Sequence, residues 1–407
     1  MGEVPGDTTV GLPYDVGRAS RVAAARTELP DWVVDCFEWG MFRTDRVVDA
    51  VVADFAKLAP GVGWRMLDDA LRSVRPTVDG APPSLEALLT PMMATPEWFD
   101  AEQIKWGAAV WWRFFPANQI GLSGAVRTGY RFGDLNKPQA MNGRSEKMAA
   151  RRYEETARWL LSATEPGALA PGGAGFNDTV KIRLVHAVIR RRLRGHIDWN
   201  RTAWGEPIHT TGMAITNNSF LTLPLTTAAL VGIEFSADER EAIRALWHWI
   251  GYLMGVPEEL LPTSIERAEL LNAAALKIFA PPDQDSQIMD AALLRAGIRA
   301  ERLLPSPLQP VVAPILRPLA SRAVWGTTNT ILNRIEQHPD DPSQVHHPLL
   351  TVLRPIVARR ERRRRKGRLG TDFDIARRQR TAVESALTLI KAAPSALQPS
   401  QAGAGTR

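Results

Sequence analysis

One stretch of the chain combines residue types that could bind a flat, iron-containing ring. It reads Lys181-Ile-Arg-Leu-Val-His-Ala-Val-Ile-Arg-Arg-Arg-Leu193. With 3.6 residues per helical turn, His186 falls between Arg183 and Arg190 and at the edge of an apolar stripe. A neutral imidazole can bind iron, and guanidiniums can bind carboxylates at the edge of a macrocycle. The apolar stripe that would cover the ring consists of Ile182, Val185, Ile189 and Leu193.

The same helix has a plainer interpretation. A histidine at the edge of a core, beside a solvated basic face, would give the same pattern, and this helix alone favours that interpretation. The hypothesis of a haem site therefore depends on what the rest of the chain supplies.

A second helical pattern precedes this one and carries further chemistry. Arg152 and Thr156 are four residues apart and share a face, and Glu155 lies one turn from Arg152. Arginine–glutamate pairs on the wet side of an ordinary amphipathic helix would explain these residues equally well. The loop at Pro171–Gly173 returns the chain, so we expect the two helices to lie antiparallel and to face one cavity.

Together these motifs resemble the catalytic core shared by latex clearing proteins (rubber oxygenases) and MpaB-type oxygenases. The resemblance covers roughly residues 100–340 and includes Trp204-Gly-Glu-Pro-Ile208 and the later stretch Trp247–Pro262. It implies an all-helical fold that holds a non-covalent b-type haem. It also implies oxidation of an alkene carbon with O₂ as the chemistry.

The resemblance assigns cofactor-binding roles to three residues. His186 matches the proximal ligand of the haem iron, and Arg183 and Arg190 match arginines that lie close to the haem. If His186 were not the ligand, His209 would be the next candidate.

Three residues of the preceding helix are the expected catalytic groups. Arg152 would stabilise negative charge that develops on oxygen, Thr156 would donate a hydrogen bond to it, and Glu155 would transfer protons if it is buried. Two departures from the latex clearing proteins accompany them. Glu155 stands where they have a distal lysine, and their general-base glutamate falls at Asn136, with Glu146 as the nearest alternative. We therefore expect an iron that no lysine caps and a substrate other than rubber.

Composition limits the class of protein. The 407 residues are 45% hydrophobic and 23% charged, which is enough for a large core in one or two domains. Cys36 is the single cysteine, which excludes a thiolate cluster, and the absence of a Cys-x-x-Cys-His motif excludes thioether attachment of a haem. The segment Met1–Asp7 lacks the basic and apolar regions of an export signal, so the cytoplasm is the expected location.

Helical patterns follow one another almost without interruption. Alternating strand patterns between hairpin turns are nearly absent, and helix signals such as the capping box of Ser236 and Glu239 recur. The fold class is therefore all-α, with one large domain that contains a buried haem pocket. We expect an extended N-terminal arm at residues 1–30, the helical domain at 31–392 and a disordered tail at 393–407.

Bulky apolar side chains near these motifs predict an apolar substrate, because burial contributes about 25 cal/mol per Å² of apolar surface. A lipid or isoprenoid chain with an alkene is the expected class. The alternative is a non-catalytic helical haem-binding or lipid-binding protein of the same fold, which the replacement of lysine by Glu155 favours. The residues expected to line the cavity are Trp106, Trp111, Trp112, Phe114, Phe115, Leu221, Leu223 and Leu225.

A basic run at Arg359–Arg368 is the main charge cluster of the chain. It could contact an anionic membrane or a nucleic acid, or it could be a solvated helix end. Aromatic residues for base stacking are missing apart from the nearby Phe373, so a nucleic acid is the least favoured partner. If the cluster has a function, we expect a peripheral membrane contact.

Overall fold

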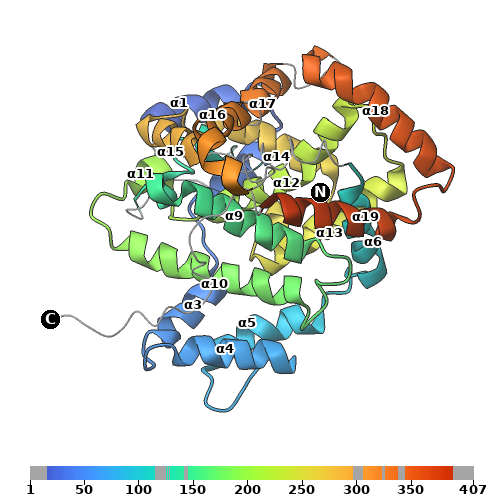
Figure 1. The fold of residues 1–407 in the computed structure, drawn as a ribbon. Helices are drawn as coiled ribbons and strands as arrows, with labels where there is room; N and C mark the ends of the chain where they lie inside the picture. Colours follow the sequence, from blue (N-terminus) through green and yellow to red (C-terminus); the bar gives the residue numbers. More distant parts are fainter. Residues whose placement is uncertain are drawn as a thin grey trace.

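The regular elements of the chain are helices (Figure 1). The computed structural model describes residues 16–114, 125, 127, 129–141, 145–296, 306–322, 326–337 and 344–387. Within these ranges the fold is all-α, as the sequence predicted. No helix in these ranges is both long and apolar enough to cross a membrane.

The centre of the molecule is built around one helix that is buried on nearly all sides. This helix, α12, spans Thr210–Leu230 and packs against α2, α13 and α14. Its many small polar side chains tolerate burial because they bond to carbonyls one turn earlier, as Thr216 does to Gly212 and Ser219 to Ile215. The surrounding helices are α2 (Asp31–Met41), α13 (Ala237–Leu253) and α14 (Ile265–Ile278).

A second group of helices covers α12 from the side of the predicted motifs. It includes α9 (Ser145–Ala163) and α10 (Ala174–Arg194), which pack against each other, and α6 (Ala101–Trp111), which packs against α13. The helix α10 begins at Ala174 after an extended Gly173. Asn177 lies inside the helix and donates from Nδ2 to the carbonyl of Gly172 at 3.3 Å.

Part of the segment predicted as an extended N-terminal arm is helical. Residues 16–26 of the predicted extended arm form helix α1 (Val16–Arg26), which packs against α14. Val22 and Ala25 are buried, and Arg21 donates from Nε to the carbonyl of Ile278 at 2.8 Å. Residues 1–15 and the predicted tail at 393–407 lie outside the described residues. The helices that follow α2 are α3 (Arg46–Phe55), α4 (Val62–Ser73) and α5 (Pro83–Ala94).

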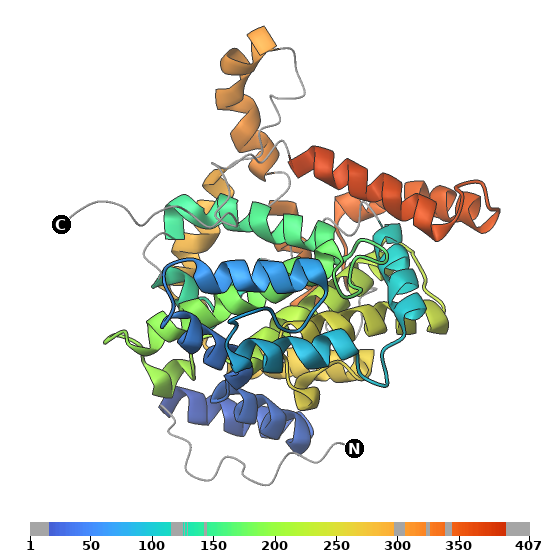
Figure 2. The same cartoon turned by 90° about the horizontal axis from the view of Figure 1, so that it is seen from below.

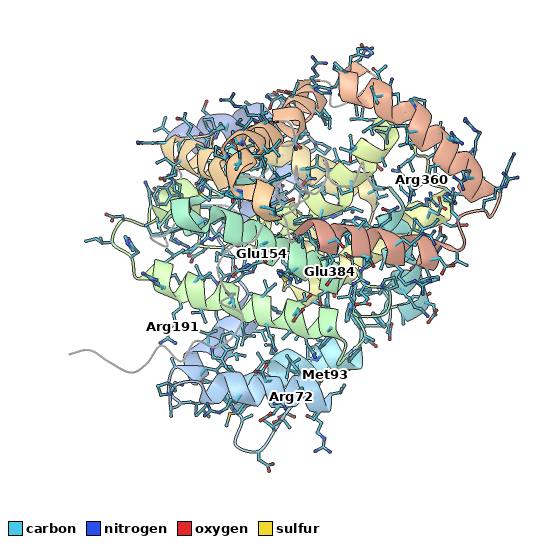
Figure 3. The ribbon with its side chains drawn as sticks, in the orientation of Figure 1. Arg72, Met93, Glu154, Arg191, Arg360 and Glu384 are labelled. Carbon is cyan, nitrogen blue, oxygen red and sulfur yellow. The ribbon has the colours of Figure 1, made fainter. Side chains whose placement is uncertain are left out.

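The C-terminal helices lie on the outside of this body. The helix α19 (Asp372–Leu387) packs across α6 and α9, whereas α18 (Pro348–Arg365) runs along an edge of the molecule (Figures 1 and 2). Figure 3 shows Arg360 of α18 and Arg72 of α4 at opposite ends of the protein. The remaining helices are α8 (Lys137–Ala140), α11 (Arg201–Trp204), α15 (Gln284–Ala296), α16 (Gln309–Ser321) and α17 (Thr327–Gln337).

The predicted capping box at the start of α13 is confirmed. The Oγ of Ser236 accepts a bond from the backbone N–H of Glu239 at 3.2 Å, and the Glu239 carboxylate accepts one from the N–H of Ser236 at 2.8 Å. Glu239 is also paired with the buried Arg113. The start of α13 is thereby fixed to the 3-10 turn η1 (Trp112–Phe114), which follows α6.

Candidate functional site

A cavity of about 380 Å³ lies between α9, α10 and α12. Its α9 wall carries Arg152, Glu155 and Thr156, and its α10 wall carries His186. The two helices therefore face one cavity, as the glycine loop predicted. Most of the rest of the lining is apolar, including Ile182, Val185, Ile189, Trp159, Trp199, Trp204, Met213, Ile215 and Phe220.

The two walls are held together by a close backbone approach. Trp159 of α9 donates from Nε1 to Thr179 Oγ1 of α10 at 3.0 Å, and that hydroxyl donates to the carbonyl of Gly175 at 2.7 Å. A Cβ on Gly175 would lie only 2.5 Å from the carbonyl oxygen of Ser162. Glycine is therefore required where the two helices meet, and this contact sets the position of the cavity walls.

His186 has the protonation state that a metal ligand needs. Burial, followed by the nearby charge of Arg190, lowers the pKa of His186 from 6.5 to about 4. Its Nδ1 is shielded from water and has no hydrogen-bond partner among the described residues. At neutral pH the side chain is thus a neutral imidazole whose Nδ1 is not bonded by any described residue.

His209 lines the same cavity, but its side chain caps the start of α12. Its Nδ1 accepts the backbone N–H of Gly212 at 2.9 Å, which caps the start of α12. Burial, and then the charge of Arg18, lowers the pKa of His209 to about 3, so the ring is neutral and its single proton is on Nε2. His209 can therefore donate a hydrogen bond from Nε2, and as long as its Nδ1 caps α12, Nε2 carries the proton and cannot bind a metal.

Arg183 and Arg190 lie behind His186 rather than on the main cavity. They line a much smaller neighbouring pocket, which shares His186 with the cavity. Arg183 Nε lies 2.5 Å from an oxygen of Asp45, and Arg190 Nε lies 2.8 Å from one of Asp49. Both aspartates come from the start of α3, so these ion pairs fix α10 against α3. Binding of cofactor carboxylates by the two arginines stays a prediction.

Arg152 brings a positive charge to the cavity wall. Its Nη1 donates to Gln139 Oε1 at 2.9 Å, and burial lowers the pKa of the guanidinium. Tyr130 lies close enough to feel this charge, and burial raises the pKa of its phenol. Because burial weakens screening by water, the charge of Arg152 acts strongly on any group inside the cavity.

A carboxylate that the sequence did not single out also lines the cavity. Asp134 is 2% exposed, and its Oδ2 accepts the N–H of Ala280 at 3.1 Å. Its Oδ1 has no partner among the described residues, and burial raises its pKa from 3.8 to about 6. By contrast, Asn136 is fully buried and donates to Ser286 Oγ at 2.6 Å, away from the cavity lining. The side chain of Glu146 lies outside the described residues.

Replacing Asp134 with Asn should stabilise the fold, and more so at high pH. The folded state binds the proton of Asp134 more tightly than the unfolded state, so stability is lost as the pH rises from 3.8 through about 6. The cost of the charged form is about 3 kcal/mol at pH 8 and about half of that at pH 5. Asn keeps an acceptor for Ala280. Urea unfolding at both pH values measures the gain, and an equal gain at the two pH values would contradict it.

The apolar residues that the sequence predicted to line the cavity are not the ones that do so. None of Trp106, Trp111, Trp112, Leu221, Leu223 and Leu225 lines the cavity, and Phe115 lies outside the described residues, as does the side chain of Phe114. Trp111 and Trp112 are fully buried in the core, where Trp112 donates to Thr164 Oγ1 at 2.9 Å. The apolar character of the cavity holds, but other side chains provide it.

The fold and the cavity define an all-helical protein, over the described residues, with a mainly apolar internal cavity. The family described as ER-bound oxygenase mpaB/B'/Rubber oxygenase, catalytic domain, matches residues 112–352. The chain belongs to this family.

Two known proteins are similar to this chain. A rubber oxygenase from Streptomyces sp. (strain K30) is 26% identical over 152 residues, which are 37% of this chain and 37% of that protein. The structure of a latex clearing protein in its closed state matches with a TM-score of 0.52 and 18% identity, over 84% of this chain and 91% of the other. At this identity the structural match shows that the two proteins share a fold.

Proposed function

We propose that the protein is a haem-dependent oxygenase that uses O₂ to oxidise an apolar, alkene-containing lipid or isoprenoid. One observation carries the proposal: His186 presents a neutral imidazole on the wall of a mainly apolar cavity. Its Nδ1 has no hydrogen-bond partner among the described residues. Membership of an oxygenase family supports the reaction class.

The residues around His186 fit a non-covalent haem. The imidazole would bind the iron, and the stripe of Ile182, Val185 and Ile189 on the same wall would pack against the ring. Arg183 and Arg190 would share their charges between the haem carboxylates and their aspartate partners. A bound haem would supply the iron centre that activates O₂.

The protein's own side chains would control charge and protons in the cavity. Arg152 would stabilise negative charge that develops on oxygen, and Thr156 would donate a hydrogen bond there. Three carboxylates line the cavity, and of these Glu206 is paired with Arg194 and Arg201, which leaves Glu155 and Asp134 as the candidate proton-transfer groups. With a pKa of about 6, Asp134 is mostly ionised at neutral pH yet can be protonated readily, so it suits a proton acceptor.

The substrate class follows from the lining. A cavity of this size, lined mainly by apolar side chains, favours a ligand that enters by burial of hydrocarbon. His186 and Arg152 lie on facing walls of the cavity, and an alkene carbon would have to lie between them to react. An unsaturated chain therefore fits better than a polar metabolite.

Oxygen uptake with a panel of chains tests the proposal. The haem-loaded protein should consume O₂ and form trapped carbonyl products with isoprenoid alcohols or unsaturated fatty acids, and not with saturated chains of equal length. Each assay is run with and without a reductant, because the sequence does not define this requirement. Cleavage of polyisoprene latex alone would contradict the expected lipid substrate.

One observation favours a second candidate function. By the resemblance, Glu155 stands at the position of the distal lysine, and either Asn136 or Glu146 stands at that of the family's base. Asn136 lies outside the cavity lining. A non-catalytic haem-binding or lipid-binding protein of the same fold would tolerate both changes. Haem binding without O₂ uptake, for every chain in the panel, would select this function.

A further inference from the structure

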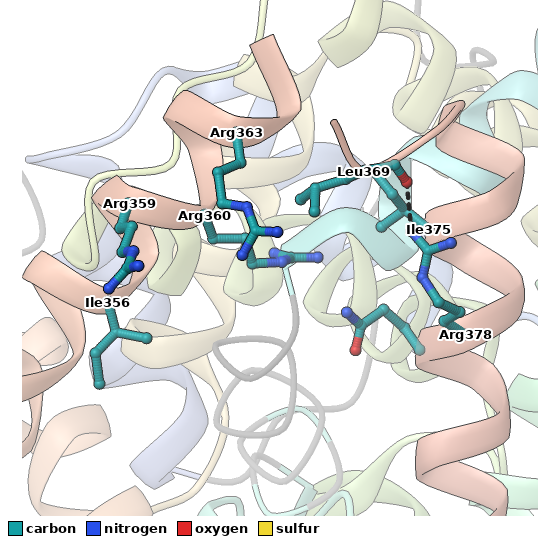
Figure 4. Close-up of a pocket in the computed structure, with 8 residues that line it drawn as sticks. Ile356, Arg359, Arg360, Arg363, Leu369, Ile375 and Arg378 are labelled. Carbon is teal, nitrogen blue, oxygen red and sulfur yellow. Dashed lines mark hydrogen bonds between the residues drawn. The ribbon is translucent and has the colours of Figure 1, made fainter. Parts of the chain in front are cut away.

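A hollow between α18 and α19 gathers positive charge away from the cavity. Its volume is about 360 Å³, and no carboxylate is among its lining residues. Figure 4 shows arginines from both helices around it. The lining consists of Arg359, Arg360, Arg363 and Arg378, with Ile356, Leu369, Ile375 and Gln379.

Three arginines of this hollow, Arg359, Arg363 and Arg378, have no carboxylate partner within the part of the chain that the structure describes. Arg359 and Arg363 are exposed and make no ion pair there, and Arg378 donates to the backbone carbonyl of Leu369. The acidic residues nearby are engaged elsewhere, Glu361 with Arg364 at 2.8 Å and Asp374 with Arg377 at 2.6 Å.

Gathering like charges has an electrostatic cost that a bound anion would remove. Arg360, at the base of the hollow, shows this cost. Burial lowers the pKa of Arg360, and the charge of Glu361 partly offsets this effect. The charges of other arginines, including Arg378 from the facing helix, lower the pKa further. The hollow therefore has the electrostatics of an anion site.

Exposed hydrocarbon continues from the hollow along α18. Val352, Ile356, Arg359 and Arg363 are spaced four, three and four residues apart, so they share one face of the helix. Val352 is 60% exposed and Ile356 58% exposed. This face carries aliphatic side chains over one turn and guanidiniums over the next, which is the pattern of helices that lie in a membrane interface.

We propose that this face of α18, together with the hollow, is a docking surface for a bilayer that contains anionic lipids. Phosphate groups of the lipids would bind the guanidiniums of the hollow. Val352 and Ile356 would enter the adjoining hydrocarbon. The position of α18 along an edge of the molecule leaves room for a flat partner (Figures 1 and 2). None of the lining residues is aromatic, so the surface lacks the stacking platform of a single-stranded nucleic acid site.

Vesicle co-sedimentation of the full chain tests the docking surface. We expect binding to vesicles of phosphatidylcholine mixed with phosphatidylglycerol, and little binding to phosphatidylcholine alone. Replacing Arg359 and Arg363 together with Gln should weaken binding about thirtyfold, or about fivefold for each guanidinium. The control replaces Arg72 and Arg75 with Gln, because both residues are exposed and Arg72 lies far from Arg360, near the opposite end of the protein (Figure 3).

Four outcomes would overturn the proposal. Equal weakening by the control pair would mean that only net charge attracts the protein to vesicles. Unchanged binding after Val352→Ser with Ile356→Ser would show that no hydrocarbon enters the membrane. Tighter binding to single-stranded DNA than to anionic vesicles, or full release by millimolar inorganic phosphate, would assign the hollow to a different anion. None of these readouts depends on the chemistry of the cavity.

Discussion

His186→Ala is expected to abolish stable haem binding. The change removes the one neutral imidazole of the cavity whose Nδ1 is unbonded among the described residues, and it leaves the apolar walls in place. Loss of a residue that merely supports a metal ligand costs about 10–100-fold in metal affinity, so loss of the ligand itself should exceed that range. Titration of the purified protein with haem, followed by absorbance, measures the affinity.

The matched control for this experiment is His209→Asn. Asparagine is a good N-cap, so it can keep the bond to the N–H of Gly212 while removing the second imidazole from the cavity. This variant should bind haem nearly as well as the wild type. The reverse result, with binding lost in His209→Asn and kept in His186→Ala, would assign the ligand to His209.

The second large effect is expected for Arg152→Ala. Removal of a group that stabilises developing charge in a buried site typically lowers turnover about 10²–10³-fold. The haem content should remain because Arg152 is on α9, across the cavity from His186. Initial rates of oxygen uptake, normalised to bound haem, measure the change.

Arg158→Ala is the control on the same helix. Arg158 is exposed and pairs with Glu154 one turn earlier, so its loss removes an arginine from α9 without touching the cavity. Its turnover should match that of the wild type. If Arg152→Ala lost haem and turnover together, Arg152 would have a structural role instead.

Local patterns were sufficient to predict the helices that carry the site. The apolar period of Ile182, Val185 and Ile189 defines a helix face, and the Pro-Gly-Gly loop reverses the chain. Both features involve residues close in sequence. Their consequence, a shared cavity that brings His186 and Arg152 together, follows because a short loop makes successive helices neighbours.

Features that depend on distant contacts could not be predicted. Asp134 resembles an ordinary loop residue, and its bond to the N–H of Ala280 spans 146 residues. The partners of Arg183 and Arg190 come from 138 and 141 residues earlier in the chain. From the sequence, the basic face of α10 is compatible with solvent or with cofactor carboxylates. In the folded protein its two arginines instead form ion pairs with aspartates of α3 and its N-cap.

The surroundings of buried aromatic residues could not be predicted from the sequence either. The sequence identifies Trp111 and Trp112 as apolar bulk but cannot say whether a core or a cavity surrounds them, since both environments favour the same side chains. The structure places both in the core. In α1, too, the packing against α14 becomes visible only in three dimensions.

The most direct test of the central claim is the visible spectrum of the full-length protein, purified from cells supplied with haem precursor. A Soret band should appear, with close to one haem per chain when the pigment is extracted and its iron quantified. The extraction should remove the pigment fully, because no Cys-x-x-Cys-His motif can attach it covalently. A protein that stays colourless and iron-free, even after reconstitution with excess haem, would contradict the assignment of His186 as a haem ligand.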